Sequence, residues 1–337
     1  MNKEKLEYGA YQVAINCLRT QPNDQVCIIT DDVTMHIGKA IESQFLKVTK
    51  KVKLFRMEDF GDRPDDGSNP LKFPDEIANY LKNSQVSVYA GRGKKGELPS
   101  FRHPMTILTD EYNIRHGHMP NVNDLLMETG MCADYAKIKE NNAKVMKLVQ
   151  GTKHAQVTTD AGTNIEVTLD PNWKWINCDG NIQPGHWSNL PDGEVFTCAK
   201  SVNGTIVVDG VLGDYMNTKY GVIAKTPVTL TLKDGRVQTV SCANKDIEKD
   251  IKEYMAQDAN ANRIGEFALG TNLGLEKLVG NLLQDEKFPG IHVALGHGYP
   301  EKTGCDWTSD AHLDMVVTKT TVVIDGKKIM EKGDFVV

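Results

Sequence analysis

Residues 291–317, IHVALGHGYPEKTGCDWTSDAHLDMVV, contain two short apolar runs, and each carries a histidine near its start. His292 lies in the first run, IHVALG, and His312 opens the second, HLDMVV. Because residues i and i+2 of a strand project to one face, His312 and Asp314 would present an imidazole and a carboxylate side by side. These groups are common ligands of zinc and other first-row metals. The stretch therefore predicts strands that carry part of a metal site.

Two carboxylates earlier in the chain have the same character. Glu266 lies inside the apolar run of RIGEFALG, and Glu194 opens the apolar run of NLPDGEVFT. A carboxylate is costly to bury unless it is paired or bound to a cation. Together with the two histidines and Asp314, these residues offer too many ligands for one four-coordinate site. They suit two divalent cations about 3.5–4 Å apart that share a carboxylate and a water. The oxygen and nitrogen donors suit Zn, Co, Mn or Fe(II).

Tyr299 follows His292 by seven residues and would lie near such ions. Its phenolic OH can stabilise the oxyanion of a tetrahedral intermediate. The alternative is a tyrosine in a loop before Pro300, with a purely structural role. The hypothesis of hydrolytic chemistry favours the first reading.

Length and composition limit the class of protein. A chain of 337 residues is too long for one ordinary core, which predicts two domains. A formal net charge of -6 argues against nucleic acid as a partner. The N-terminal segment has no apolar run of signal-peptide length, and no window is apolar enough to span a membrane. The seven cysteines are scattered, without a CxxC pair. We therefore expect a cytoplasmic protein that does not act at a membrane.

The pattern of elements changes near residue 150. Before it, helical and strand patterns alternate, which predicts a parallel sheet covered by helices. The expected helices are 4–20, 35–50, 74–83 and 122–150, and the expected strands are 25–30, 52–57 and 85–91. After it, a hairpin over 154–170 and many further strands follow, with one helix over 246–257. We predict an α/β fold in which an N-terminal parallel-sheet α/β domain, residues 1–150, precedes a strand-rich α+β metal-binding catalytic domain, residues 151–337.

Two polar motifs in the first part of the chain allow more than one interpretation. GRGKKG (91–96) has the glycine spacing of a dinucleotide-binding loop, but the following ELPSFRHPM has two prolines and no helical period. We expect a basic, flexible loop; the alternative is that Arg92, Lys94 or Lys95 reaches an anionic group at the domain interface. His116 and His118 lie two apart in RHGHM, with no carboxylate adjacent. We expect a polar cleft loop there, with substrate contact or metal binding as alternatives.

The C-terminal motifs resemble those of the aminopeptidase T family of metallopeptidases, which includes PepS-like leucyl aminopeptidases. The resemblance depends on NLPDGEVFT, RIGEFALGTN, QDEKFPGIHVALG, the spacing from His292 to Tyr299, and the late HLD. It is close over residues 190–316 and general in the N-terminal part.

This resemblance implies a set of functional residues. The implied metal ligands are Glu194, Glu266, His292, His312 and Asp314, with Glu266 bridging the ions and Tyr299 in the active site. Glu286 is implied as a sixth metal ligand, because it matches a further acidic ligand of the family, although one residue is inserted between it and the histidine. The resemblance also implies a homodimer that removes N-terminal, leucine-like residues from peptides with two Zn, Co or Mn ions.

A second branch of the same fold family suggests another function. It contains ring-cleaving dioxygenases related to 2,5-dihydroxypyridine dioxygenase, which hold one Fe(II) with two histidines and one carboxylate. Its His-x-Asp pair matches His312 and Asp314, but its other histidine falls where this chain has Glu266. The position that corresponds to Glu194 is apolar in that branch. These differences favour the peptidase; a hydrolase of non-peptide amides and a non-enzymatic assembly protein are further alternatives.

Overall fold

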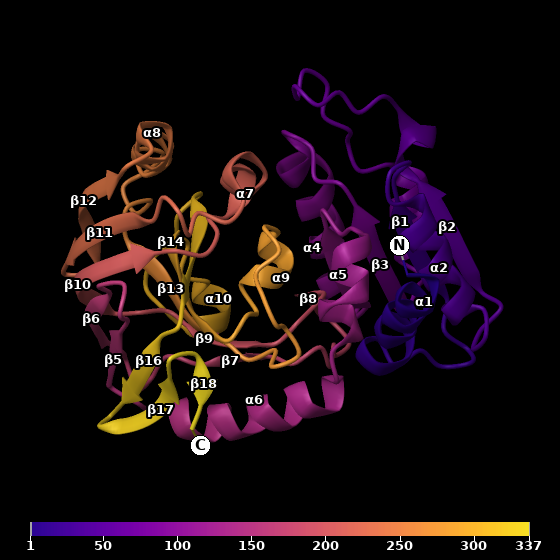
Figure 1. Ribbon diagram of the computed structural model, residues 1–337. Helices are drawn as coiled ribbons and strands as arrows, with labels where there is room; N and C mark the ends of the chain where they lie inside the picture. Colours follow the sequence, from indigo (N-terminus) through magenta and orange to yellow (C-terminus); the bar gives the residue numbers. More distant parts are fainter. Residues whose placement is uncertain (1, 337) are drawn as a thin grey trace. The chain divides into compact units, whose positions relative to one another are not determined.

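The computed structural model describes residues 2–336, and its chain forms two compact units. Unit 1 comprises Met1–Tyr135 and Gly180–Asp192, and unit 2 comprises Ala136–Asp179 and Gly193–Val337. Figure 1 labels many of the elements of both units. The boundary expected at residue 150 is the far end of helix α6 (Tyr135–Val149), whereas the units divide near its start. The difference arises because Val145 and Val149 pack into the core of unit 2.

Unit 1 is built on a parallel sheet with the strand order β2-β1-β3-β4-β8. Its strands are β1 (Val26–Thr30), β2 (Val52–Arg56), β3 (Val86–Gly91), β4 (Arg115–Pro120) and β8 (His186–Asn189). Its helices are α1 (Lys3–Tyr11), η1 (Gln12–Cys17), α2 (Met35–Phe45), η2 (Met57–Phe60), α3 (Asp75–Leu81), η3 (Leu98–Arg102), α4 (His103–Glu111), α5 (Asp124–Glu128) and η4 (Gly130–Cys132). The expected helix over 122–150 is thus divided into α5, η4 and α6.

The strands of this sheet are buried on both faces. All residues of β1 and β3 are buried, as expected where helices cover a parallel sheet on each side. Cys27 and Ile29 of β1 share a core cluster with Ile77 of α3 and Met105 of α4. Helix α2 contacts β1 and β2. The alternating βαβ pattern of the sequence therefore predicted the class of this unit correctly.

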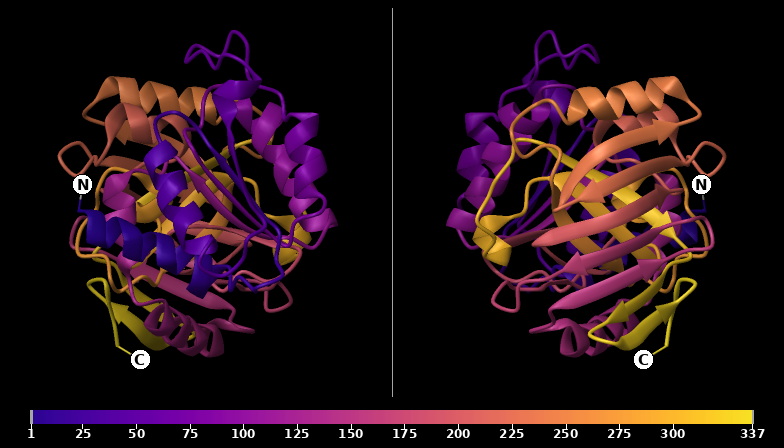
Figure 2. Two further views of the ribbon diagram at one scale, coloured as in Figure 1. Left: turned by 90° about the vertical axis from the view of Figure 1, so that its right-hand side faces the viewer. Right: turned by 90° about the vertical axis from the view of Figure 1, so that its left-hand side faces the viewer.

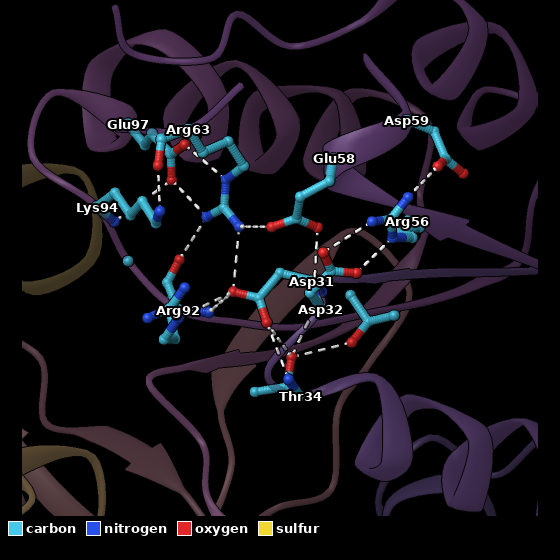
Figure 3. Close-up of polar contacts among 12 residues, drawn as sticks. Asp31, Asp32, Thr34, Arg56, Glu58, Asp59, Arg63, Arg92, Lys94 and Glu97 are labelled. Carbon is cyan, nitrogen blue, oxygen red and sulfur yellow. Dashed lines mark hydrogen bonds and ion pairs between the residues drawn. The ribbon is translucent and has the colours of Figure 1, made fainter. Parts of the chain in front are cut away.

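The carboxyl ends of β1 and β3 carry a buried network of charges (Figure 3). Doubly wound sheets commonly bind ligands at this place, where the strand order reverses. In this chain Asp31 occupies that position and accepts hydrogen bonds from the backbone N–H groups of Thr34 (2.9 Å) and Arg92 (2.8 Å). Arg63 lies beside Asp31 and pairs with it (3.1 Å) and with Glu97 (2.7 Å). The network closes this edge of the sheet with internal ion pairs.

The GRGKKG segment leaves β3 at Gly91 and continues as a basic loop, as expected. Its Lys94 forms an ion pair with Asp65 (3.1 Å) and donates a hydrogen bond to the carbonyl of Arg63. A helical segment, η3 followed by α4, begins at Leu98 despite the prolines, because Pro99 and Pro104 occupy first-turn positions where no N–H is needed. The expectation that no helix follows this motif was therefore wrong.

His116 and His118 lie in strand β4 rather than in a polar cleft loop, so that expectation was also wrong. Both side chains are buried. Ser87 contacts His116 Nδ1 at 2.7 Å, and the two imidazoles contact each other at 3.2 Å. Burial lowers the pKa of His116 to about 3, which keeps it neutral. Trp187 and Tyr89 pack against His118, so these histidines are partnered inside unit 1.

Unit 2 contains two antiparallel sheets. The larger has the order β12-β11-β10-β6-β5-β16-β17-β18 and the smaller the order β15-β14-β13-β9-β7. The strands are β5 (His154–Thr158), β6 (Asn164–Thr168), β7 (Ile176–Cys178), β9 (Glu194–Thr197), β10 (Ser201–Val208), β11 (Val228–Lys233), β12 (Arg236–Cys242), β13 (Ile264–Gly270), β14 (Gly290–Gly296), β15 (His312–Thr318), β16 (Thr321–Ile324), β17 (Lys327–Glu331) and β18 (Asp334–Phe335). The helices are α6, α7 (Asp214–Tyr220), α8 (Lys245–Tyr254), α9 (Leu282–Asp285) and α10 (Pro300–Thr303).

The two sheets of unit 2 pack face to face around one core. In the right-hand view of Figure 2, strands β10–β12 lie side by side, with the smaller sheet behind them. Ile206 and Leu230 of the larger sheet share a hydrophobic cluster with Val293 and Leu313 of the smaller one. The hairpin of β5 and β6 forms where the sequence predicted it. Within residues 2–336, no helix is both long and apolar enough to cross a bilayer.

Candidate metal centre

The strand register brings the predicted ligands to one face of the smaller sheet. Glu266 of β13 and Asp314 of β15 both pair with Ala294 of β14, so the three side chains form one row across the sheet. His292 and His312 lie two residues from this row along their own strands and therefore face the same way. Three strands that are distant in sequence thus contribute to one surface.

Glu194 reaches the same surface from the neighbouring strand β9. It pairs with Gly270, which lies four residues after Glu266 along β13 and so has the same orientation. A Cβ atom on Gly270 would lie only 2.0 Å from the carbonyl oxygen of Phe288, so the glycine allows the backbone to approach closely there. Five of the six ligands predicted from the sequence, all except Glu286, therefore share one face of the sheet.

The opposite face of the same strands belongs to the hydrophobic core. Val293, Leu295, Leu313 and Met315 alternate with the polar residues and are fully buried in the cluster between the two sheets. This packing fixes the register, because a shift by one residue would turn the ligands into the core. The period-two pattern of apolar and ligand residues in the sequence is the direct cause of the arrangement.

The ligand atoms form two groups that share Glu266. One group contains Glu194, Glu266 and His292, the other contains Glu266, His312 and Asp314, and within each group the atoms lie within 4.8 Å of one another. Glu266 Oε1 is 3.1 Å from His292 Nε2, and Glu266 Oε2 is 3.7 Å from His312 Nε2. The two oxygens of one carboxylate thus face different groups, as in a carboxylate that bridges two cations.

The residues of these groups fit divalent ions. Glu194 Oε2 is buried, has no hydrogen-bond partner, and lies 3.4 Å from His292 Nε2. A buried carboxylate oxygen without a partner is unfavourable, and a cation would remove that penalty. Only oxygen and imidazole nitrogen are available in the two groups, a donor set that suits Zn, Co or Mn.

The surrounding carboxylates change the titration of the two histidines. Burial opposes the charged form of His292, but the hydrogen bond with Glu266 and the charges of Glu194 and Glu266 outweigh it and raise its pKa to about 9. Burial likewise opposes the charge on His312, but Asp314 and Glu266 raise its pKa to about 10. Without a metal, both imidazoles are therefore protonated at neutral pH and partly balance the carboxylates.

Tyr299 lies beside the second group. Its hydroxyl is 3.5 Å from His312 Nε2, and its ring packs against Phe196 and His312. The backbone of Tyr299 is left-handed (φ 52°), directly before helix α10. Burial and the nearby carboxylates raise the pKa of Tyr299 well above its ordinary value. The phenol therefore keeps its proton and can act as a hydrogen-bond donor.

Glu286 lies close to the centre but is held differently from the other predicted ligands. It caps the C-terminal end of helix α9 and belongs to none of the ligand groups found among the described side chains. Its Oε1 lies 2.7 Å from the ammonium of Lys287, which also lies 2.7 Å from Glu194 Oε1. Burial raises the pKa of Glu286 to about 8, against the opposing effect of Lys287. Lys287 was missed from the sequence, where only its position beside an expected acidic ligand set it apart.

The sequence profile of the family described as thermophilic metalloprotease (M29) matches residues 125–335, which is more than half of the chain. The chain belongs to the M29 family of metalloproteases. It is therefore a metal-dependent hydrolase that acts on peptide bonds, and the resemblance seen in its C-terminal motifs is confirmed. No curated protein sequence matches the chain.

Solved structures confirm the fold of this M29 member. AmpT from Thermus thermophilus is 16% identical, with a TM-score of 0.73, and the match covers 99% of this chain and 100% of that one. 2,5-Dihydroxypyridine dioxygenase from Pseudomonas putida KT2440 is 14% identical with the same TM-score of 0.73, and the match covers 100% of this chain and 98% of that one. At such identities the two likenesses bear on the fold alone. The mixed α/β class predicted from the sequence is confirmed.

Proposed function

We propose that this M29 metalloprotease is an aminopeptidase that removes N-terminal, leucine-like residues from peptides with the help of two divalent ions. The observation that carries the proposal is the position of Glu266. Its two oxygens face two separate ligand groups, one with Glu194 and His292 and the other with His312 and Asp314. In this proposal Glu266 would help to hold both ions, and Zn, Co or Mn would occupy the two positions.

Two bound divalent ions would supply a water of lowered pKa and polarise the scissile carbonyl. The chain's own residues would position this chemistry. Tyr299, which keeps its proton, would donate a hydrogen bond to the oxyanion of the tetrahedral intermediate. The strands β13, β14 and β15 hold the ligand carboxylates and imidazoles on one rigid surface, so little reorganisation is needed when charge develops.

The exopeptidase specificity would come from the free α-amino group of the substrate. We propose that this group binds at one ion or at a carboxylate of the centre, which peptides with a blocked N-terminus cannot do. A leucine-like first residue is expected from the resemblance to leucyl aminopeptidases. The dimeric state and the cytoplasmic location also remain predictions; light scattering coupled to size-exclusion chromatography tests the first.

A pair of matched substrates tests the proposal. The protein is freed of metal, loaded separately with Zn, Co and Mn, and incubated with Leu-p-nitroanilide and with its N-acetylated form. We expect metal-dependent release of nitroaniline from the free amine only, and equal cleavage of both substrates would contradict an aminopeptidase. A panel of X-Ala-Ala peptides gives the preference at the first residue. Absence of release with all three metals would count against the proposed function as a whole.

The mononuclear dioxygenase reading has less support from the geometry. A single iron held by two histidines and one carboxylate would need His292 and His312 around one position. Here each histidine belongs to a different ligand group, with Glu266 between them. Elemental analysis distinguishes the two readings, since the peptidase predicts about two ions per chain. Oxygen uptake with a dihydroxypyridine and one iron per chain would favour the dioxygenase.

A further inference from the structure

Lys287 is a fully buried lysine in the wall of the candidate metal centre. Its side chain is 1% exposed, and its ammonium lies 2.7 Å from Glu194 Oε1 and 2.7 Å from Glu286 Oε1. Lysine is almost never fully buried unless it is paired, because removing an ammonium from water is costly. The position of Lys287 therefore depends on these two carboxylates.

The two oxygens of Glu194 have different surroundings. Oε1 faces Lys287, whereas Oε2 is buried, has no hydrogen-bond partner and faces His292. The ammonium thus occupies one side of the carboxylate and leaves the other side for the ligand group with Glu266. A carboxylate fixed in this way is presented to a cation through a single oxygen.

Glu286 has its nearest charged partner in Lys287. It comes from helix α9, while Glu194 comes from strand β9, and the ammonium lies between them. Two carboxylates that converge on one positive centre form an arrangement that a divalent ion can also bind. In this chain the positive centre is a side chain. The positive charge of Lys287 lies between the two carboxyl groups.

We propose that the ammonium of Lys287 is a resident cation of the centre, which occupies the position between Glu194 and Glu286 and so limits the centre to two metal ions. In this arrangement Glu286 binds the lysine and is not a metal ligand. Lys287 is a positioning residue, since it acts through Glu194 and does not reach the reacting atoms. The inference rests on the proposed function for the two remaining positions.

Metal counting tests this inference directly. Wild-type protein and four variants, Lys287→Met, Lys287→Arg, Glu286→Gln and the double variant Lys287→Met/Glu286→Gln, are dialysed against excess Mn²⁺, and the ions per chain are measured. We expect Glu286→Gln and Lys287→Arg to bind as many ions as the wild type. Lys287→Met should bind one ion more, between the two freed carboxylates, and the double variant should lose that additional ion.

Lys200→Met is the matched control, because Lys200 pairs with Asp170 (3.0 Å) on the surface of the same unit. It should not change the ion count. Loss of an ion in Glu286→Gln would show that Glu286 is a ligand and would overturn the inference, as would an unchanged count in Lys287→Met. If Lys287→Met does not fold, the number of ions bound by Glu286→Gln tests the inference by itself.

The failure of this inference can be separated from the failure of the proposed function. A wild-type protein that binds no Mn²⁺, Zn²⁺ or Co²⁺ would contradict the proposed function. The melting temperature of the metal-free protein reports on the buried ion pair without any metal. Metal-free Lys287→Met should melt below the wild type, while Lys200→Met should not; equal melting of all three would contradict the role of Lys287.

Discussion

Glu266 is the single side chain that both ligand groups share, so its loss removes a ligand from each group. We expect Glu266→Ala to lose both ions and more activity than any other single change at the centre, a loss of more than about 10³-fold. Elemental analysis and the rate on Leu-p-nitroanilide check this result. Glu253→Ala, at an exposed glutamate of helix α8, is the control and should leave both unchanged. Full metal occupancy in Glu266→Ala would contradict the bridging role.

Tyr299 places its hydroxyl 3.5 Å from Nε2 of His312, beside the second ligand group. Tyr299→Phe removes the hydroxyl and keeps the ring that packs against Phe196. We expect kcat to fall by about 10²–10³-fold, as for the loss of one oxyanion donor, with the ion count and KM little changed. Steady-state kinetics beside elemental analysis test this prediction. A rise in KM with unchanged kcat would instead indicate a role in binding the substrate.

The two ligand histidines predict that metal binding releases protons. Without a metal, the pKa of His292 is raised to about 9 and that of His312 to about 10, so both carry a proton at pH 7. Imidazole binds a metal only in its neutral form, so we expect about two protons to leave per chain at pH 7. Calorimetric titrations in buffers of different ionisation enthalpy measure this number. Metal affinity that does not rise between pH 6 and pH 9 would contradict the prediction.

The raised pKa values of these two histidines also make the stability of the metal-free protein depend on pH. Both pKa values are raised above that of an unfolded histidine, about 6.5. The protonated imidazoles therefore contribute stability that is fully present below pH 6.5. This contribution is lost as the pH rises through 9 and 10.

At the scale of elements, the end of strand β14 shows how closely the backbones approach. Gly296 pairs with His312 and has φ 101°, and a Cβ atom there would lie 2.2 Å from the carbonyl oxygen of Ala311. We expect Gly296→Ala to lower the free energy of unfolding by about 3–5 kcal/mol through strain and overlap. Gly326→Ala is the control, since φ is 80° but the space is open, and it should cost about 1–2 kcal/mol. Equal losses in urea unfolding would show that the close approach is unimportant.

The strands of the metal centre could be predicted from sequence because their alternation is local. His292 and His312 recur with apolar neighbours at period two, and that pattern alone places ligand and core residues on opposite faces. Glu194 and Glu266 were recognised because a carboxylate in an apolar run needs a partner. The geometry of the five residues agrees with this reading, and their role as ligands remains a prediction that metal counting tests.

Other features depend on contacts that no local pattern contains. Lys287 resembles any charged residue in a loop, and only the fold brings its ammonium between Glu194 and Glu286. His116 and His118 were read as a polar loop because the strand around them is short and rich in polar residues, yet it pairs with β3 along one edge and with β8 along the other. In both cases the environment comes from residues distant in the chain.

At the scale of the whole molecule, unit 1 depends on the buried guanidinium of Arg63 (Figure 3). It pairs with Asp31, Glu58 and Glu97, and the first and last of these are also buried. Arg63→Met removes the cation that these three carboxylates share, and we expect it to cost about 3–5 kcal/mol of stability. Arg56→Met, at an exposed arginine that pairs with Asp32, should cost much less stability, because water screens this ion pair. Similar losses in chemical unfolding would contradict the importance of burial.

The titration of Asp31 makes the stability of unit 1 depend on pH. Burial opposes its charge, but hydrogen bonds from the backbone of Thr34 and Arg92 and from the side chains of Thr34 and Arg63 lower its pKa to about 2. A carboxylate with a lowered pKa contributes stability above its unfolded value, about 3.9, and loses it as the pH falls towards 2. The contribution of Asp31 to stability should be fully present at pH 7 and weakened at pH 3.

The short strand β8 gives the chain an unusual connectivity. Because Gly180–Asp192 returns to unit 1, the polypeptide passes from one unit to the other three times. A single cut, whether made by a protease or by a gene truncation, therefore cannot release either unit intact. A fragment that stops at Tyr135 would leave the hydrogen-bonding groups of β4 uncovered along one side, and exposed edges of this kind promote aggregation. Separate production of unit 1 requires residues 180–192 to be grafted behind residue 135 through a designed linker.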